Sequence, residues 1–309
     1  MSKILITGTK SFVGTNFRRF SKYRDVDEIS LYENKPEDIN FARYDIVLHL
    51  AAIVHQSKKI TDNEYFRVNR DLCLKVAENA KKAGVRQFVF LSTLKVYGDI
   101  ISDHYLRTEN STCFPDDSYG KSKYEAEIGL KKMENDNFTV SIIRPSLVYG
   151  IGVKSNMLSI VKLIEFFPIL PLGSICNKRN FIYTENLVGF IDRIIEKKAS
   201  GVFIAKDDDA ISTTQLASYL AESLDRKVTL FKLPKFFISA GTFLLPSAFG
   251  RLFGSFDFDN SETKKILNYT PYYSTEQGIK KWLADFKSVK PSNNGKINFN
   301  FLGVFNIII

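Results

Sequence analysis

The first half of this chain alternates short β-branched segments with stretches of helical periodicity. Five segments are predicted strands: KILIT, EISLY, YDIVLHLA, QFVFLS and TVSIIRP. Parallel strands need crossover connections, so this alternation predicts an α/β fold in which helices cover both faces of a doubly wound parallel sheet. In the clearest helical segment, residues 64–85, Phe66, Leu72 and Val76 fall near one face and Gly84 provides the stop.

The pattern loosens after Gly150, which predicts a change of domain. We expect residues 1–150 to form the sheet domain and residues 151–290 to form mainly a smaller α/β domain, with some interleaving. The later segments are predicted as helices at 185–198, 212–224 and 274–287, strands at 201–205 and 227–233, and loops at 168–173 and 245–254. Residues 291–309, a polar linker and an apolar end, form a tail to which no role is assigned.

Composition excludes several classes of protein. With 309 residues, 44% hydrophobic and 25% charged, the chain is an ordinary globular protein. The start MSKILITG is not a leader and no apolar run is long enough to span a bilayer, which predicts a cytoplasmic protein without a membrane span. The three cysteines, Cys73, Cys113 and Cys176, lie far apart and predict neither a metal site nor disulfides. The net charge of +9 lacks a basic-aromatic module, so no nucleic-acid partner is expected.

The segment LITGTKSFVG, residues 5–14, leads from the first predicted strand into the first predicted helix. Gly8 and Gly14 stand where a dinucleotide-binding turn has its outer glycines, and Ser11 replaces the middle one. Such a turn brings backbone N–H groups and a helix N-terminus close to a pyrophosphate. The segment indicates a phosphate-binding turn; a plain strand-to-helix turn is the alternative that the segment alone leaves open.

Two further segments carry reactive groups. In DSYGKSKYEAE, Tyr119 and Lys123 are four residues apart and therefore share a helix face. A lysine there can hold a cofactor ribose and lower the phenol pKa, which would make Tyr119 an acid or base near neutral pH. Ser92 and Thr93 end a predicted strand, where open α/β sheets bind ligands. The alternatives are a surface Tyr–Lys pair and hydroxyls that only cap a turn.

Together these segments resemble the extended short-chain dehydrogenase/reductases that act on nucleotide sugars. The matches cover residues 3–195 and, more weakly, extend to about Leu283; in order they are TGTKSFVG, VLHLAA, VNRDLCLKV, STLKVYGD, YGKSK, IIRPSLVYG and RNFIYTENLVGFI. The resemblance implies that residues 1–150 form a Rossmann-type NAD(P)-binding domain and residues 151–290 form mainly a nucleotide-sugar domain.

The resemblance also implies roles for individual residues. Tyr119 would be the proton donor or acceptor, Lys123 would position the ribose, and Thr93 would hydrogen-bond the reacting sugar oxygen. The cofactor would be bound by Tyr119 and Lys123 together with Gly8, Lys10, Ser11, Phe12, Val13, Gly14, Glu33, Leu50, Ala51, Ala52 and Asn69. The UDP-sugar would be bound by Thr93, Asn156, Arg179 and Arg251. Glu33 favours NAD and Lys10 favours NADP, so the choice between the two cofactors stays open.

Departures from the family pattern narrow the reaction. Leu94 and Lys95 replace the Asp-Glu pair of sugar 4,6-dehydratases, which argues against water elimination, and Leu147 replaces an asparagine found in many 4-epimerases. The leading hypothesis is an NAD(P)H-dependent C4-reductase of a UDP-4-keto-6-deoxy-N-acetylhexosamine, in the biosynthesis of surface polysaccharide sugars. The alternatives are a UDP-hexose or UDP-N-acetylhexosamine 4-epimerase and a catalytically silent dinucleotide-binding protein.

Proteins of this kind commonly dimerise by pairing two helices with their copies, here residues 62–83 and 118–134. We therefore predict a homodimer, formed through apolar side chains of these helices: Tyr65, Leu72, Val76, Ala80, Tyr124, Ile128 and Met133.

Overall fold

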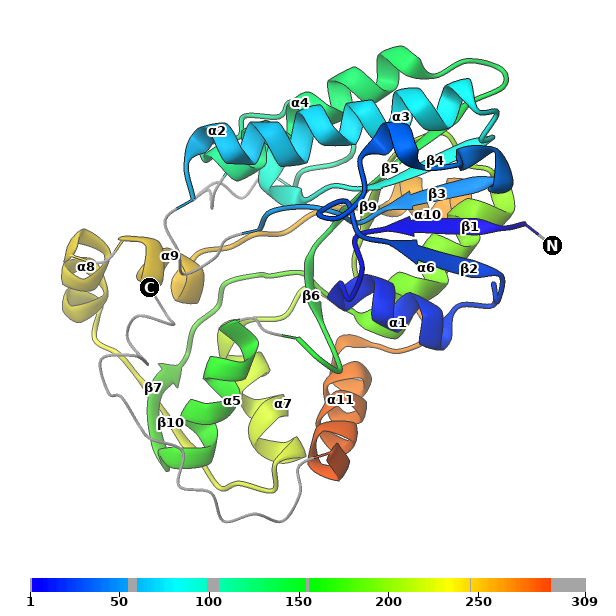
Figure 1. The fold of residues 1–309 in the computed structure, drawn as a ribbon. Helices are drawn as coiled ribbons and strands as arrows, with labels where there is room; N and C mark the ends of the chain where they lie inside the picture. Colours follow the sequence, from blue (N-terminus) through cyan, green and yellow to red (C-terminus); the bar gives the residue numbers. More distant parts are fainter. Residues whose placement is uncertain (1, 55–59, 99–105, 154–155, 245, 290–309) are drawn as a thin grey trace.

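A six-stranded parallel sheet organises the larger part of the molecule (Figure 1). The computed structural model describes residues 2–54, 60–98, 106–153, 156–244 and 246–289. The sheet order is β2-β1-β3-β4-β5-β9, formed by Val26–Ile29, Ile4–Thr7, Ile46–His49, Gln87–Leu91, Thr139–Pro145 and Gly201–Ala205. The chain runs outward from β1 in both directions, so the switch point, where such sheets bind ligands, lies between β1 and β3.

Continuous apolar runs explain the central strands. Every residue of β1 and of β3 is buried, as expected of parallel strands covered on both faces. Ile4 pairs with Val26 on one side and with Ile46 on the other, which fixes the register of the ligand-binding edge. The second strand lies slightly earlier than the predicted segment 28–32, because the chain after Ile29 turns, with Asn34 N–H donating to the carbonyl of Ser30.

Helices cover both faces of the sheet. On one face, α1 (Phe12–Phe20) and α6 (Thr184–Lys197) bury Phe17, Leu187 and Ile191 against β1. On the other face lie α2 (Asp62–Tyr65), a π-helical segment (Phe66–Leu72), α3 (Cys73–Lys82) and α4 (Ser118–Met133). This arrangement confirms the predicted Rossmann-type doubly wound fold.

The helices predicted to dimerise use part of their apolar surface within the chain. Val76 and Ala80 are fully buried against their own sheet, so they cannot contribute to a subunit interface. Ile128 on α4 is 39% exposed and remains available on the outer face. The homodimer stays a prediction, and fewer of the predicted apolar residues are available for its interface than the helical pattern indicated.

A smaller lobe packs beside the sheet and forms its own core around Met157, Leu216 and Trp282. Its elements are β6 (Leu147–Tyr149), α5 (Asn156–Phe166), β7 (Ile169–Gly173), β8 (Phe181–Tyr183), α7 (Thr213–Ser223), β10 (Thr229–Lys232), α8 (Lys235–Leu244), α9 (Pro246–Phe253) and α11 (Thr275–Val289). Although α6, β9 and α10 (Ser261–Leu267) follow residue 150, they pack on the larger body, so the two parts interleave.

Two predicted loops are regular elements. Residues 168–173 contain β7, which pairs with β10, and residues 245–254 contain α9, which begins at Pro246. Proline is well suited to the first position of a helix because it has no N–H to leave unsatisfied. Within the described residues, no helix is both long and apolar enough to span a membrane.

Candidate active site

The glycine-rich turn lies at the switch point of the sheet. Gly8 has a φ of +108°, and a Cβ built there would lie 2.8 Å from the backbone N of Ala51, at the end of β3. Ser11 caps α1 by accepting a hydrogen bond from Gly14 N–H at 3.1 Å. The turn therefore combines a close backbone approach with a capped helix N-terminus, and both features fit a dinucleotide pyrophosphate.

Other residues of the expected cofactor site form its walls. The side chains of Val13 and Leu50 are buried in the core, and Phe12 is partly buried, so these residues can offer a ligand mainly backbone and apolar surface. Ala51 and Ala52 follow β3 directly and are partly exposed. Their small side chains leave room beside the glycine-rich turn.

Asn69 supports the site through the protein backbone. Its Oδ1 accepts from Ile53 N–H at 2.8 Å, and its Nδ2 donates to the Ile53 carbonyl at 3.0 Å and to Ser122 Oγ at 3.1 Å. The amide is fully buried and lies in the π-helical segment, a type of distortion frequent at functional sites. Asn69 thus holds the segment after Ala52 in place. The direct contact with the cofactor that the resemblance implies for Asn69 stays a prediction.

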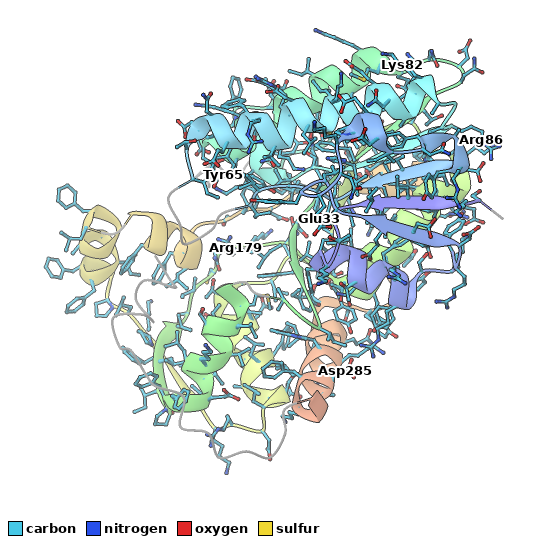
Figure 2. All side chains as sticks on the ribbon, in the orientation of Figure 1. Glu33, Tyr65, Lys82, Arg86, Arg179 and Asp285 are labelled. Atoms are coloured by element: carbon cyan, nitrogen blue, oxygen red, sulfur yellow. The ribbon has the colours of Figure 1, made fainter. Side chains whose placement is uncertain are left out.

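The expected ribose end is a pocket of about 550 Å³ after β2. It is lined by Leu31, Tyr32, Glu33, Asn34, Lys35, Pro36, Arg67, Asp71, Leu72 and Lys75. Figure 2 shows Glu33 beside the end of the sheet. The Glu33 carboxylate suits ribose hydroxyls, whereas Lys35, Arg67 and Lys75 suit a 2′-phosphate, so the lining is compatible with either cofactor.

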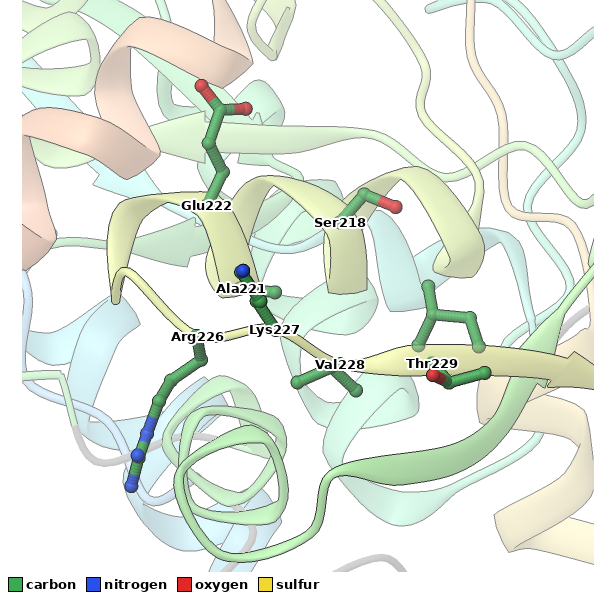
Figure 3. Close-up of a pocket in the computed structure, with 8 residues that line it drawn as sticks. Ser218, Ala221, Glu222, Arg226, Lys227, Val228 and Thr229 are labelled. Carbon is green, nitrogen blue, oxygen red and sulfur yellow. The ribbon is translucent and has the colours of Figure 1, made fainter.

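A second pocket, of about 440 Å³, lies in the smaller lobe (Figure 3). It is lined by Ser218, Ala221, Glu222, Arg226, Lys227, Val228, Thr229 and Leu230. None of the predicted site residues contributes to it. We therefore assign it no part in the candidate active site.

Tyr119 lies in the first turn of α4, and the cap of that helix is held firmly. Asp117 accepts from Gly120 N–H at 2.6 Å with Oδ1 and pairs with Lys95 Nζ at 2.5 Å through Oδ2. The ring of Tyr65 meets the Tyr119 ring edge-on, with 6.3 Å between centroids. One turn later, the buried Lys123 Nζ donates to the Leu91 carbonyl at 2.6 Å.

The protonation state of the pair follows from burial. Burial raises the pKa of Tyr119 to about 12, and a hydrogen bond with the Thr93 side chain acts in the opposite direction. Burial also lowers the pKa of Lys123 to about 8. The expected lowering of the phenol pKa by Lys123 is thus wrong for this structure, because the ammonium points to a backbone carbonyl and desolvation dominates. Tyr119 is a protonated phenol at neutral pH, next to Thr93.

Behind these residues lies a buried polar network that the sequence did not reveal. Glu127 and Arg144 are 0% and 2% exposed and form a bidentate ion pair, with Nε to Oε1 at 3.0 Å and Nη2 to Oε2 at 2.5 Å. Ser92 Oγ donates to Glu127 at 2.5 Å, and Arg144 donates to the Tyr97 hydroxyl at 2.5 Å. The network joins β5 and α4 to the segment after β4, where Ser92 directly precedes Thr93.

The predicted substrate residues lie toward the smaller lobe. Figure 2 shows Arg179 between the sheet domain and that lobe, and its Nη1 donates to the Gly254 carbonyl at 3.4 Å. Asn156 begins α5 and Arg251 lies in α9, but their side chains fall outside the described part of the structure. Leu147, at the start of β6, is 40% exposed.

The fold, the glycine-rich turn and the Thr–Tyr–Lys group define an NAD(P)-dependent enzyme of the Rossmann class. Residues 4–204 match the model of the NAD dependent epimerase/dehydratase family, and the chain belongs to that family. It is 32% identical to a UDP-glucose 4-epimerase of Vibrio cholerae, over 92% of this chain and 95% of the relative. It is 28% identical, over 75% of each chain, to the N-acetyl-alpha-D-glucosaminyl-diphospho-ditrans,octacis-undecaprenol 4-epimerase of Escherichia coli O157:H7.

Solved structures support the fold. A UDP-N-acetylglucosamine 4-epimerase from Bacillus cereus superposes with a TM-score of 0.76 at 19% identity, covering 93% of this chain and 100% of that one. A dTDP-4-dehydrorhamnose reductase from Clostridium acetobutylicum gives 0.74 at 18% identity, with coverages of 92% and 99%. The protein is therefore an enzyme of the nucleotide-sugar epimerase, dehydratase and reductase group that uses NAD or NADP.

Proposed function

We propose that the protein is an NAD(P)-dependent 4-epimerase of a UDP-hexose or UDP-N-acetylhexosamine. The observation that supports this is the grouping of Thr93, Tyr119 and Lys123 at the carboxyl end of β4, in a chain 32% identical to a UDP-glucose 4-epimerase across almost its whole length. We prefer the epimerase to the reductase that the sequence favoured, because the similarity to the UDP-glucose 4-epimerase extends over both lobes of the chain.

The bound nicotinamide supplies a hydride acceptor and donor at C4. Tyr119 would exchange a proton with the C4 oxygen. In the oxidation half, the phenolate of Tyr119 would take the hydroxyl proton as hydride leaves C4, and in the reduction half the resulting phenol would return that proton when hydride is added to the opposite face of the keto sugar. Positive charge beside the phenol favours the phenolate that the first half needs, and an oxidised nicotinamide would supply it. Thr93 hydrogen-bonds the same oxygen, and Lys123 holds the ribose. Arg179 and Arg251 would neutralise the UDP pyrophosphate. Asn156 would contribute a neutral hydrogen-bonding side chain to the UDP-sugar.

A C4-reductase of a UDP-4-keto-6-deoxy-N-acetylhexosamine is the second candidate, and two observations favour it. Leu147 places an apolar, partly exposed side chain where many 4-epimerases have an asparagine. Burial keeps the Tyr119 phenol protonated, which suits donation of a proton to a new alkoxide. In this reaction NAD(P)H is consumed and the sugar is not returned to its starting oxidation state.

Product analysis separates the candidates. Incubated with UDP-N-acetylglucosamine or UDP-glucose and trace NAD, an epimerase interconverts the C4 epimers without net cofactor turnover, as NMR would show. A reductase leaves both sugars unchanged and oxidises NAD(P)H only with the 4-keto substrate. Tyr119→Phe should lower either turnover roughly 100-fold or more, while Tyr124→Phe on the same helix should not. An enzyme silent in both assays would overturn the proposal.

A further inference from the structure

Within the part of the chain that the structure describes, the hairpin of α8 and α9 leaves large apolar side chains uncovered. Figure 1 shows α8 at the outer edge of the smaller lobe. Four of its large side chains are more than half exposed: Phe236 at 76%, Phe237 at 57%, Phe243 at 86% and Leu244 at 72%. The spacing of residues 236, 243 and 244 places them on one face of the helix. The other side packs on α9, where a Cβ at Gly241 would lie within 2.3 Å of the Phe249 ring.

Further large apolar side chains are exposed on the elements that precede α8 in the chain. Phe231 of β10 is 43% exposed, and Ile169 of the neighbouring strand β7 is 59% exposed. Phe166, at the end of α5, is 49% exposed. Scattered apolar side chains are normal on a protein surface, whereas a contiguous group of large ones marks an interaction surface.

The charged residues of the segment that contains α8 and α9 have one sign. From residue 226 to residue 254 the sequence contains no Asp or Glu, and its charged residues are Arg226, Lys227, Lys232, Lys235 and Arg251. Arg226, Lys227 and Lys232 are exposed. An apolar helix face with basic neighbours is complementary to a bilayer that carries anionic lipids, since the rings enter the interface while the cations stay at the headgroups.

We propose that α8 docks the enzyme on the surface of an anionic lipid bilayer. The helix lies in the plane of the interface; at roughly 1.5 Å per residue it is far too short to cross a membrane. The proposal concerns location and is independent of the reaction assigned above.

Docking also orients the site, because the hairpin is attached to the candidate substrate region. Asn177 Nδ2 donates to the carbonyls of Leu252 at 3.1 Å and Gly254 at 3.0 Å, and Arg179 Nη1 donates to Gly254 as well. Binding through α8 therefore brings the Arg179 side of the molecule toward the membrane.

Vesicle cosedimentation of the full-length protein tests this. We expect binding to phosphatidylcholine vesicles that contain phosphatidylglycerol, and much weaker binding to pure phosphatidylcholine or at high salt. Phe236→Gln combined with Phe243→Gln should weaken binding by roughly tenfold or more, because two exposed rings no longer enter the interface. Lys227→Glu with Lys232→Glu should weaken it about fivefold per charge and only on anionic vesicles. Phe114→Gln, at a 72% exposed ring outside the hairpin, is the matched control and should bind normally.

Two outcomes would overturn the proposal. If the double phenylalanine variant binds as well as the wild type, another segment makes the contact. If the wild type does not bind anionic vesicles, a bilayer is not the partner of α8; a lower mass of the double phenylalanine variant in light scattering would then identify a second copy of the chain as the partner.

Discussion

Removing the charge of Arg144 while keeping an unbranched apolar side chain probes the network beneath the candidate active site. In Arg144→Met, Glu127 keeps a carboxylate that is 0% exposed and retains only Ser92 as a charge-stabilising partner among those described. Breaking one side of a buried ion pair costs about 3–5 kcal/mol, because the remaining charge stays desolvated. Against a typical unfolding free energy of about 5–15 kcal/mol, that loss is severe.

Urea unfolding followed by circular dichroism measures the change. Arg144→Met should lower the free energy of unfolding by about 3–5 kcal/mol, and adding Glu127→Leu should recover most of it, since no lone charge is then buried. Arg70→Met is the control: Arg70 pairs with Glu125 at 2.6 Å, but both side chains are at least 34% exposed, so the cost should be under about 1 kcal/mol. A loss below about 1 kcal/mol in Arg144→Met, or no recovery in the double variant, would refute this account.

Three further predictions follow from the site and the helices. Gly8→Ala should weaken NAD(H) binding at least roughly tenfold in titrations, because its Cβ would meet Ala51, whereas Gly84→Ala, with a φ of +86° and nothing within 4 Å, should leave it unchanged. Burial lowers the pKa of Lys123 from 10.5 to about 8, so between these two pH values the unfolded chain carries a proton on Lys123 that the folded chain lacks. The free energy of unfolding of the wild type, relative to that of Lys123→Met, should therefore rise with pH across this window by on the order of 3 kcal/mol. A difference that stays constant with pH would contradict the burial of Lys123. Ile128→Glu should convert a dimer to a monomer in light scattering, and a wild type that is already monomeric would remove the dimer proposal.

Local patterns predicted the features that depend on neighbours in sequence. The strand alternation gave the parallel sheet, and the spacing of Tyr119 and Lys123 placed both on α4. The Glu127–Arg144 pair could not be predicted in this way, because its members are 17 residues apart and meet only through the packing of α4 on β5. The pKa of Tyr119 was missed for a related reason: its direction depends on burial, which spacing does not report.

The α8–α9 hairpin shows the opposite limitation. Its prolines and glycines indicated a loop around 245–254, yet Pro246 begins α9 and Gly241 allows α8 to pack closely on it. Proline and glycine usually interrupt helices, but here Pro246 begins α9 and Gly241 lies at the contact between α8 and α9. The large apolar side chains on the other side of α8 do not reach a core of the described structure, so they remain at the surface.

The structure also explains why the cofactor turn can do without its middle glycine. Ser11 has a φ of −67° and a ψ of 148°, an extended conformation open to any residue, so no glycine is required there. Its hydroxyl oxygen caps Gly14 N–H, while the N–H groups of Phe12 and Val13 belong to the first turn and have no partner within the helix. The steric requirement falls on Gly8, whose φ of +108° and contact with Ala51 exclude a side chain. Ser11 is therefore compatible with an anion-binding end of α1, and we expect the turn to bind the cofactor pyrophosphate although the sequence departs from the family pattern here.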